Sequence, residues 1–223
     1  MKFAPALGSL ATALLLAFGV PALAQPGLGA TPSAPSAAAA ASGLTFDFAT
    51  LLKAKPGQWA DYHVGKAGAP SDAGKSGVTI HYALAERTEK QLALEMDTAT
   101  GKGDMKMRTT FVPDGADRWK LLQLTIAVGS QQTAMPADQV AQTPPVKVSD
   151  PPGTFVGNET ITTPAGTFPC KHYTRALGPG APVLGLWIND KVYPTGLVKT
   201  ALGSTGIEMS LTAVGGGEPA KGK

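Results

Sequence analysis

Cysteine is nearly absent from this sequence: Cys170 is the only one in 223 residues. A chain with one cysteine cannot form an internal disulfide, so its stability must come from apolar packing. The alternation of a strand places Cys170 on the same face as Phe168 and His172. We expect Cys170 to be a small buried apolar residue. The alternative is a reactive or intermolecularly paired thiol, for which the sequence shows no partner motif.

Clusters of one charge sign are also lacking. The chain has 19 basic and 16 acidic residues, a formal net charge of +3, and the two signs are interspersed without a basic run. A nucleic-acid surface would gather Lys and Arg on one element, so we expect no nucleic-acid partner. The apolar stretch from Leu10 to Val20 is shorter than the roughly 20 residues that span a bilayer. No second apolar stretch is longer, so no transmembrane segment is expected in the mature chain.

The motifs of common catalytic sites are missing. No Gly-x-Ser-x-Gly motif is present, and Gly203-Ser204-Thr205-Gly206 has the composition of a turn. No glycine-rich phosphate loop followed by Lys and Ser or Thr occurs. We therefore expect a protein that is not an enzyme, with no catalytic residues and no cofactor.

The three histidines are candidate metal ligands. Asp61 and His63 are two residues apart and would share one face of a strand, and His81 and His172 are the remaining histidines. Three histidines and a carboxylate can bind zinc where the fold brings them together. The spacing is not diagnostic of such a site, so we expect scattered surface histidines and no bound metal.

What is present begins with a secretory signal. Lys2 supplies a positive charge, the apolar stretch follows, and Ala22-Leu23-Ala24 offers small residues for cleavage. We expect residues 1–24 to be a signal peptide of bacterial type. The mature protein would then be exported to the periplasm or the medium of a Gram-negative-type bacterium.

Composition divides the mature chain into three parts. Residues 25–43 are almost entirely Ala, Pro, Gly, Ser and Thr, which bury too little apolar area to offset the entropy of ordering. We expect a disordered linker there, a β-rich domain over 44–214, and a flexible tail over 215–223.

Within this domain, hydrophobic residues recur with the two-residue period of strands. Only residues 46–55 favour a helix, which Pro56-Gly57 would end. Residues 129–152 are polar and proline-rich and are expected to form a long connection with one helical turn near 137–140. The sequence predicts about ten strands, at 59–64, 77–85, 90–98, 105–112, 119–128, 154–162, 167–175, 183–189, 196–202 and 207–214.

Two predicted strands carry apolar residues at positions that would point to both faces of the sheet. Leu121 alternates with Leu122 and Leu124, and Trp187 alternates with Leu186 and Ile188. A sheet with one wet face would alternate more cleanly. The pattern leaves two possibilities open: a second sheet covers the outer face, as in a sandwich, or a concave face lines an apolar groove, as in an incomplete barrel.

Two segments of the second half resemble a known pattern. Residues 157–170 read GNETITTPAGTFPC, and residues 186–199 read LWINDKVYPTGLVK. These segments, with Trp59-Ala60-Asp61-Tyr62, resemble exported bacterial proteins of unknown function that share the fold of the lipoprotein carriers of the LolA/LolB type. The resemblance covers about a quarter of the domain. It implies a mainly β fold, with a single antiparallel, strongly curved sheet or incomplete barrel, a short N-terminal helix as lid, and an apolar cavity.

The implied function is binding without chemistry. We expect an apolar cavity for a lipid or other hydrophobic ligand, lined by Met96, Met105, Met107, Trp119 and Trp187. The alternative is a non-catalytic structural or interaction module of the cell envelope, whose partner would be another envelope protein.

Overall fold

The computed structural model describes residues 46–67, 77–100, 103–177 and 182–216. The predicted signal peptide and linker, and the tail from residue 217 on, lie outside the described residues.

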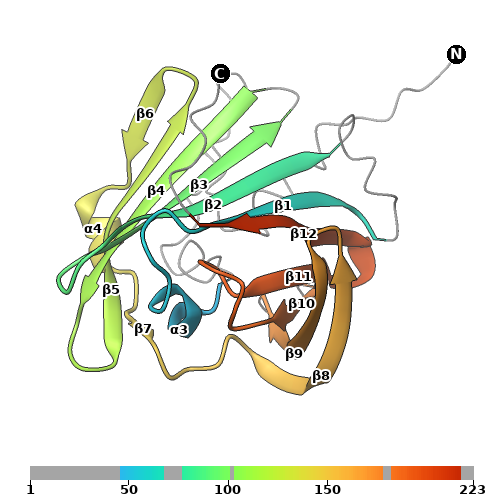
Figure 1. Cartoon of the computed structure of the whole chain (residues 1–223). Helices are drawn as coiled ribbons and strands as arrows, with labels where there is room; N and C mark the ends of the chain where they lie inside the picture. Colours follow the sequence, from blue (N-terminus) through green and yellow to red (C-terminus); the bar gives the residue numbers. More distant parts are fainter. Residues whose placement is uncertain (1–45, 68–76, 101–102, 178–181, 217–223) are drawn as a thin grey trace, which may run out of the picture.

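The described part of the chain forms one antiparallel sheet of twelve strands (Figure 1). Eleven strands follow the order β6-β5-β4-β3-β2-β1-β12-β11-β10-β9-β8, and β7 pairs with β5 beside β6. The strands are β1 (Trp59–Lys66), β2 (Val78–Arg87), β3 (Leu92–Thr100), β4 (Gly103–Pro113), β5 (Arg118–Val128), β6 (Gln131–Ala134), β7 (Val146–Lys147), β8 (Thr154–Thr163), β9 (Gly166–Ala176), β10 (Val183–Ile188), β11 (Leu197–Leu202) and β12 (Ile207–Gly215).

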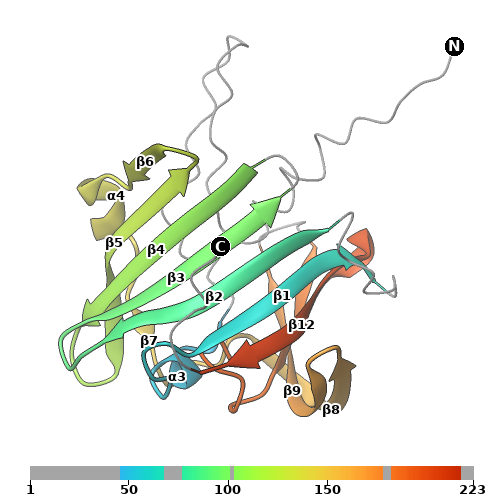
Figure 2. The same ribbon diagram turned by 45° about the horizontal axis from the view of Figure 1, so that its top comes forward.

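The sheet is open. Its edges are β6 and β8, and the sheet neither closes nor curls strongly (Figure 2). The prediction of a mainly β fold built on a single antiparallel sheet with a short N-terminal helix is confirmed. The expected strong curvature is not found. The pairing of β1 with β12 makes one broad sheet of the two halves of the chain, so no second sheet is formed among the described residues.

One face of this sheet, here called the inner face, carries the core. The alternation of each strand sends every second side chain to this face. In β4, Met105, Met107 and Phe111 are buried, whereas Lys106 and Arg108 are exposed on the outer face, as the sequence predicts. The inner face also buries residues of the neighbouring strands: Tyr62, Val64, Ile80, Tyr82, Leu84, Leu92, Leu94, Met96, Leu121, Leu124, Leu184, Leu186, Ile188, Met209 and Leu211.

A β-bulge resolves the apparent two-faced character of β5. Thr110 pairs with Gln123 but Phe111 pairs with Leu121, so Leu122 is the extra residue. Leu121 and Leu124 are therefore both buried, while Leu122 is 51% exposed. Neither a second sheet nor an apolar groove is needed to explain the pattern in this strand.

The helix α3 (Phe48–Leu51) covers the inner face and is shorter than the predicted range 46–55. Asp47 caps its first turn by accepting a hydrogen bond from the Thr50 amide, at 3.1 Å. Phe48 is anchored by edge-to-face contact with Phe111, with ring centroids 5.3 Å apart, and lies near Trp119. After Leu51 the chain continues to Ala54 in turns bonded between residues three apart, which ends the α-helix.

The predicted long connection is more ordered than expected. It contains β6, the helix α4 (Ala137–Ala141) and β7, and α4 confirms the expected helical turn. A short 3-10 turn, η1 (Gly203–Thr205), precedes β12. Among the described helices, none has the length and apolar character needed to cross a bilayer.

Candidate functional site

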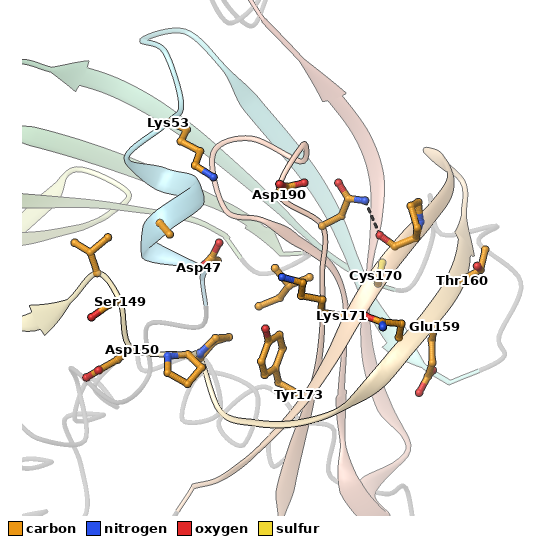
Figure 3. A pocket seen from close by; sticks show the side chains of 18 residues that line it. Asp47, Lys53, Ser149, Asp150, Glu159, Thr160, Cys170, Lys171, Tyr173 and Asp190 are labelled. Atoms are coloured by element: carbon orange, nitrogen blue, oxygen red, sulfur yellow. Dashed lines mark hydrogen bonds between the residues drawn. The ribbon is translucent and has the colours of Figure 1, made fainter. Parts of the chain in front are cut away.

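A cleft of about 670 Å³ opens on the inner face of the C-terminal half of the sheet (Figure 3). Its walls are α3 with the residues just before and after it, the loop 148–152, the strands β8 and β9, and the end of β10 with the turn that follows it. Its lining is Asp47, Ala49, Lys53, Val148, Ser149, Asp150, Pro151, Pro152, Asn158, Glu159, Thr160, Pro169, Cys170, Lys171, Tyr173, Ile188, Asn189 and Asp190.

The turn between β10 and β11 fixes one wall of the cleft. The Asn189 side chain donates a hydrogen bond to the Pro169 carbonyl at 2.7 Å and accepts one from the Lys191 amide at 2.9 Å. The Gly196 amide donates to the Val192 carbonyl, and Gly196 has a φ of 77°, a conformation that side chains disfavour. This turn, which lies within the resembling segment 186–199, thus ties β10 to β9 and sets the position of Asn189.

A buried tyrosine connects this turn to β1. The Tyr62 hydroxyl donates to the Leu197 carbonyl at 2.9 Å and lies 2.5 Å from the Thr195 hydroxyl. Its burial raises the pKa of Tyr62 well above the usual value, so the hydroxyl stays protonated. The Thr195 carbonyl accepts a bond from the Asp47 amide at 2.8 Å, which docks α3 on the same turn. The segments that carry the sequence resemblance therefore meet at one junction.

The cleft contains charges of both signs. In Figure 3 the side chains of Lys53, Lys171 and Tyr173 point into it, and Asp190 lies at its rim. Asp47 is already engaged, because its carboxylate accepts bonds from the amide and the hydroxyl of Thr50. Within the described part of the chain, neither of the two lysines nor Asp190 forms an ion pair, so these three charges are free to meet a ligand.

A second polar group lies on the outer face of β8–β10, and its Glu159 also reaches the edge of the cleft. Glu159 accepts hydrogen bonds from Trp187 at 2.8 Å and from His172 at 2.7 Å, and these bonds hold the pKa of the Glu159 carboxyl below its usual value. The Trp187 ring stacks on His172 with centroids 4.2 Å apart, and the Lys199 ammonium lies 5.4 Å from its centroid. The indole of Trp187 thus contacts His172 and Lys199 on the neighbouring strands, and the bonds of Glu159 connect β8 to β9 and β10.

The structure separates the five predicted ligand-contacting residues. Met96, Met105 and Met107 are neighbours on β3 and β4 and are buried in the core, with exposures of 2%, 9% and 7%. Trp119 packs beside Phe48 at the far end of the same half of the sheet. Trp187 belongs to the outer face of β10.

Neither of the two cavities described here is lined by these five residues. The cleft is one, and the other is a hollow of about 170 Å³ between β5, β6 and α4. This hollow is mainly apolar, with Leu124, Ile126, Val128, Met135 and Pro136 in its walls. Its volume is below the range of about 300–1,000 Å³ that is usual for small-molecule sites.

The histidines lie apart on the outer face. His81 is hydrogen-bonded to Asp61 at 2.5 Å, which raises the pKa of His81 against the opposing effect of partial burial. His172 is bound to Glu159 on the other half of the sheet. The described residues contain no group of three or more side chains placed to hold a metal ion.

Cys170 is buried, as the sequence predicts, with 3% of its surface exposed. Burial, and secondarily the negative charge of Glu159, raises the pKa of the thiol to about 11. A thiol with this pKa is almost fully protonated at neutral pH and is a poor nucleophile.

Sequence reasoning missed Lys53, Lys171 and Asp190 as site residues. The only signal for them was indirect: the two resembling segments, 157–170 and 186–199, supply most of the strand wall of the cleft. The loop 148–152 was recognised as a connection but not as a wall.

No protein-family model matches the chain, and no curated protein matches it. Among solved structures, the chain is similar to a putative lipoprotein from Parabacteroides distasonis, with 14% identity, a TM-score of 0.36, and coverage of 72% of this chain and 96% of that one. It is also similar to the hypothetical protein CT021 from Chlamydia trachomatis, with 11% identity, a TM-score of 0.35, and coverage of 78% and 96%.

Proposed function

We propose that this chain is an exported, non-catalytic binding module and that the cleft between α3, the loop 148–152 and β8–β10 is its ligand site. The observation that carries the proposal is the cleft itself, whose volume of about 670 Å³ falls within the usual range for ligand sites. Export rests on the signal sequence of residues 1–24.

The charges of the cleft indicate the class of ligand. Lys53 and Lys171 offer two ammonium groups, and Asp190 offers a carboxylate from another wall; the Asp150 carboxylate also lines the cleft but is paired with Lys147 at 3.7 Å. A ligand with a single negative charge would be attracted by the lysines and repelled by the Asp190 carboxylate. A ligand with both a cationic and an anionic group can meet both, and an unblocked peptide end or a segment of a partner protein has this chemistry.

A peptide titration tests this proposal. The isotope-labelled mature protein is titrated with triglycine, which has free termini, and with its acetylated and amidated form, followed by NMR. We expect chemical-shift changes at amides of the cleft with the free peptide, and a weaker response with the blocked one, because only the free form has both charges.

Matched variants locate the binding. Lys171→Gln and Asp190→Asn should each reduce the response to triglycine, whereas Lys106→Gln, on the outer face and 69% exposed, should leave it unchanged. Shift changes confined to another surface, or an equal response to the blocked peptide, would contradict the proposed ligand class.

A second candidate is the hydrophobic-ligand function implied by the sequence resemblance. The observation that favours it is the composition of the inner face, where Phe48 of the short helix α3 packs on Phe111 and where Met96, Met105 and Met107 are also buried; Met side chains adapt to irregular shapes. In this candidate an acyl chain would displace α3 and contact Met96, Met105 and Met107.

Native mass spectrometry separates the two candidates. The mature protein purified from its secretory compartment is weighed before and after organic extraction. A mass excess that extraction removes would support the hydrophobic ligand. A bare polypeptide mass, together with a response to triglycine, would leave the polar cleft as the binding site.

A further inference from the structure

Arg175 of β9 carries a charge that has no partner within the described part of the chain. Its side chain is partly buried, and the Nε and Nη2 atoms are shut off from solvent without a hydrogen-bond partner. No ion pair between described residues includes Arg175. Burial lowers the pKa of its guanidinium, as expected for a cation without a neighbouring carboxylate. Because a buried charge without a counter-charge destabilises a fold, its presence here indicates a role in binding.

The two unpartnered atoms indicate the class of ligand. Nε and Nη2 form one edge of the planar guanidinium, and their N–H bonds point in parallel. A carboxylate has two oxygens at the matching spacing and accepts both bonds at once, which a single-atom anion such as chloride cannot do. Phosphate also has paired oxygens, but its higher charge is costlier to bury beside Leu184, the buried partner of Arg175 on β10. The geometry therefore favours a carboxylate.

Arg175 continues one wall of the cleft. On β9, Lys171, Tyr173 and Arg175 occupy successive positions of the inner face, and the first two line the cleft. The loop 148–152, which forms another wall, leads directly into Gly153. A Cβ atom at Gly153 would stand 3.4 Å from the Cβ atom of Arg175, so the end of the loop lies against this residue. Arg175 is thus the next inner residue beyond Tyr173, where the loop meets β9.

We propose that Arg175 is the anion-binding residue of the cleft and holds the carboxylate of a ligand through its Nε and Nη2 atoms. The inference rests on the proposed function in one respect, because it takes the cleft as the way in. Two kinds of molecule carry such a carboxylate: a peptide with a free C-terminus and an acyl chain with an acid head. On its way to the guanidinium the ligand displaces the ring of Tyr173, whose aromatic neighbour Phe155 is 53% exposed.

NMR of the arginine side chains tests the proposal. The isotope-labelled mature protein is titrated with acetate while the Nε–H signal of Arg175 is followed. We expect a saturable shift of this signal and slower hydrogen exchange of its proton, because the bound carboxylate accepts the N–H bond. Chloride and inorganic phosphate at the same ionic strength should have a weaker effect. No response to acetate, or an equal response to chloride, would overturn the proposal.

Variants separate a binding role from a structural one. Arg175→Lys keeps the charge but loses the paired donors, and should weaken acetate binding, followed at the amides of β9, about tenfold or more. The control is Arg118→Met, which changes an exposed arginine of β5 and should leave binding unchanged. Arg175→Met should abolish acetate binding and leave the urea midpoint of unfolding unchanged or higher, because it removes an unpartnered buried charge. A clearly lower midpoint would assign Arg175 to the framework of the fold and overturn the proposal.

Three further ligands identify the source of the carboxylate. A shift of the Arg175 signal with triglycine but not with triglycine amide would support the proposal with a peptide end as ligand, and a shift with octanoate would support it with an acyl chain. A response of the cleft amides to triglycine while the Arg175 signal stays in place would overturn this inference and leave the proposed function. A response of Arg175 to acetate, with no response of the cleft to triglycine, would support this inference and contradict the proposed ligand class.

Discussion

The inner face of this one sheet differs between its two halves. Over β2–β5 it is filled, because α3 and the aromatic cluster around Phe48 pack against it. Over β8 and β9 it opens into the polar cleft, whereas the inner residues of β10 are buried. The same ladder of backbone hydrogen bonds runs through both halves, so the difference comes from the inner side chains and from the segments that cover them.

The inner positions of the strands account for this contrast. In β3 and β4 they are occupied by apolar residues such as Leu94, Met96 and Met107. In β9 they are Lys171 and Tyr173, which line the cleft, and Arg175, whose burial lowers the pKa of its guanidinium. One half of the sheet therefore carries a packed apolar core, and the other carries polar and charged residues.

The largest expected effect lies in the filled half. Phe48→Ala removes the aromatic anchor of α3 and should lower the free energy of unfolding by about 3–5 kcal/mol, because the lost ring leaves a cavity in a packed cluster. Tyr173→Ala, in the half-exposed wall of the cleft, should cost clearly less. Urea denaturation measures the free energy of unfolding of both variants. Equal decreases would show that the two halves of the sheet do not differ in packing.

The second-largest loss of stability is expected at the junction between the two halves, where Tyr62 of β1 meets the turn between β10 and β11. Tyr62→Phe keeps the buried ring but removes the hydroxyl that meets Thr195 and Leu197, leaving buried acceptors without a donor. We expect a loss of about 1–3 kcal/mol in the free energy of unfolding. Tyr82→Phe is the matched control: Tyr82 is a buried tyrosine of the neighbouring strand, and no hydroxyl bond of this kind connects it to the turn. Equal losses of unfolding free energy in the two variants would show that the Tyr62 hydroxyl bonds do not contribute specially to stability.

Much of the fold was predictable because local patterning decides it. Alternation located ten of the strands within a few residues of their observed bounds. The β5 bulge was not predictable, since alternation assumes a regular pair and an extra residue shifts every later side chain to the other face.

The candidate site was much less predictable than the fold. Lys53, Lys171 and Asp190 are ordinary exposed charges in the sequence, separated by more than 100 residues along the chain in the case of Lys53. Only the order of strands brings β9 and β10 beside α3. The apolar character of the methionines makes them candidates for a ligand site, but the same character places them in the buried core.

A pH-dependent effect should appear on the outer face, where polar pairs connect neighbouring strands. Asp61 raises the pKa of His81, so this pair stabilises the fold below the unfolded value near pH 6.5 and loses the effect as pH rises through the folded value. Asp61→Asn should therefore destabilise the protein near pH 5.5 and much less near pH 9. NMR titration of His81 should show its pKa falling in the variant, whereas an unchanged titration would exclude Asp61 as the cause.

The smallest effect on stability is expected in the cleft. It gives the clearest test of the difference between the filled and the open half of the inner face. Lys53→Gln and Lys171→Gln remove exposed charges that form no ion pair within the described chain, so the free energy of unfolding should change by less than about 0.5 kcal/mol. The same variants should lower the response to triglycine. A residue that can be changed without cost to folding, yet with loss of binding, is held there by its function. A destabilised but fully binding variant would instead assign these lysines to the framework, and the open half of the sheet would then need another explanation.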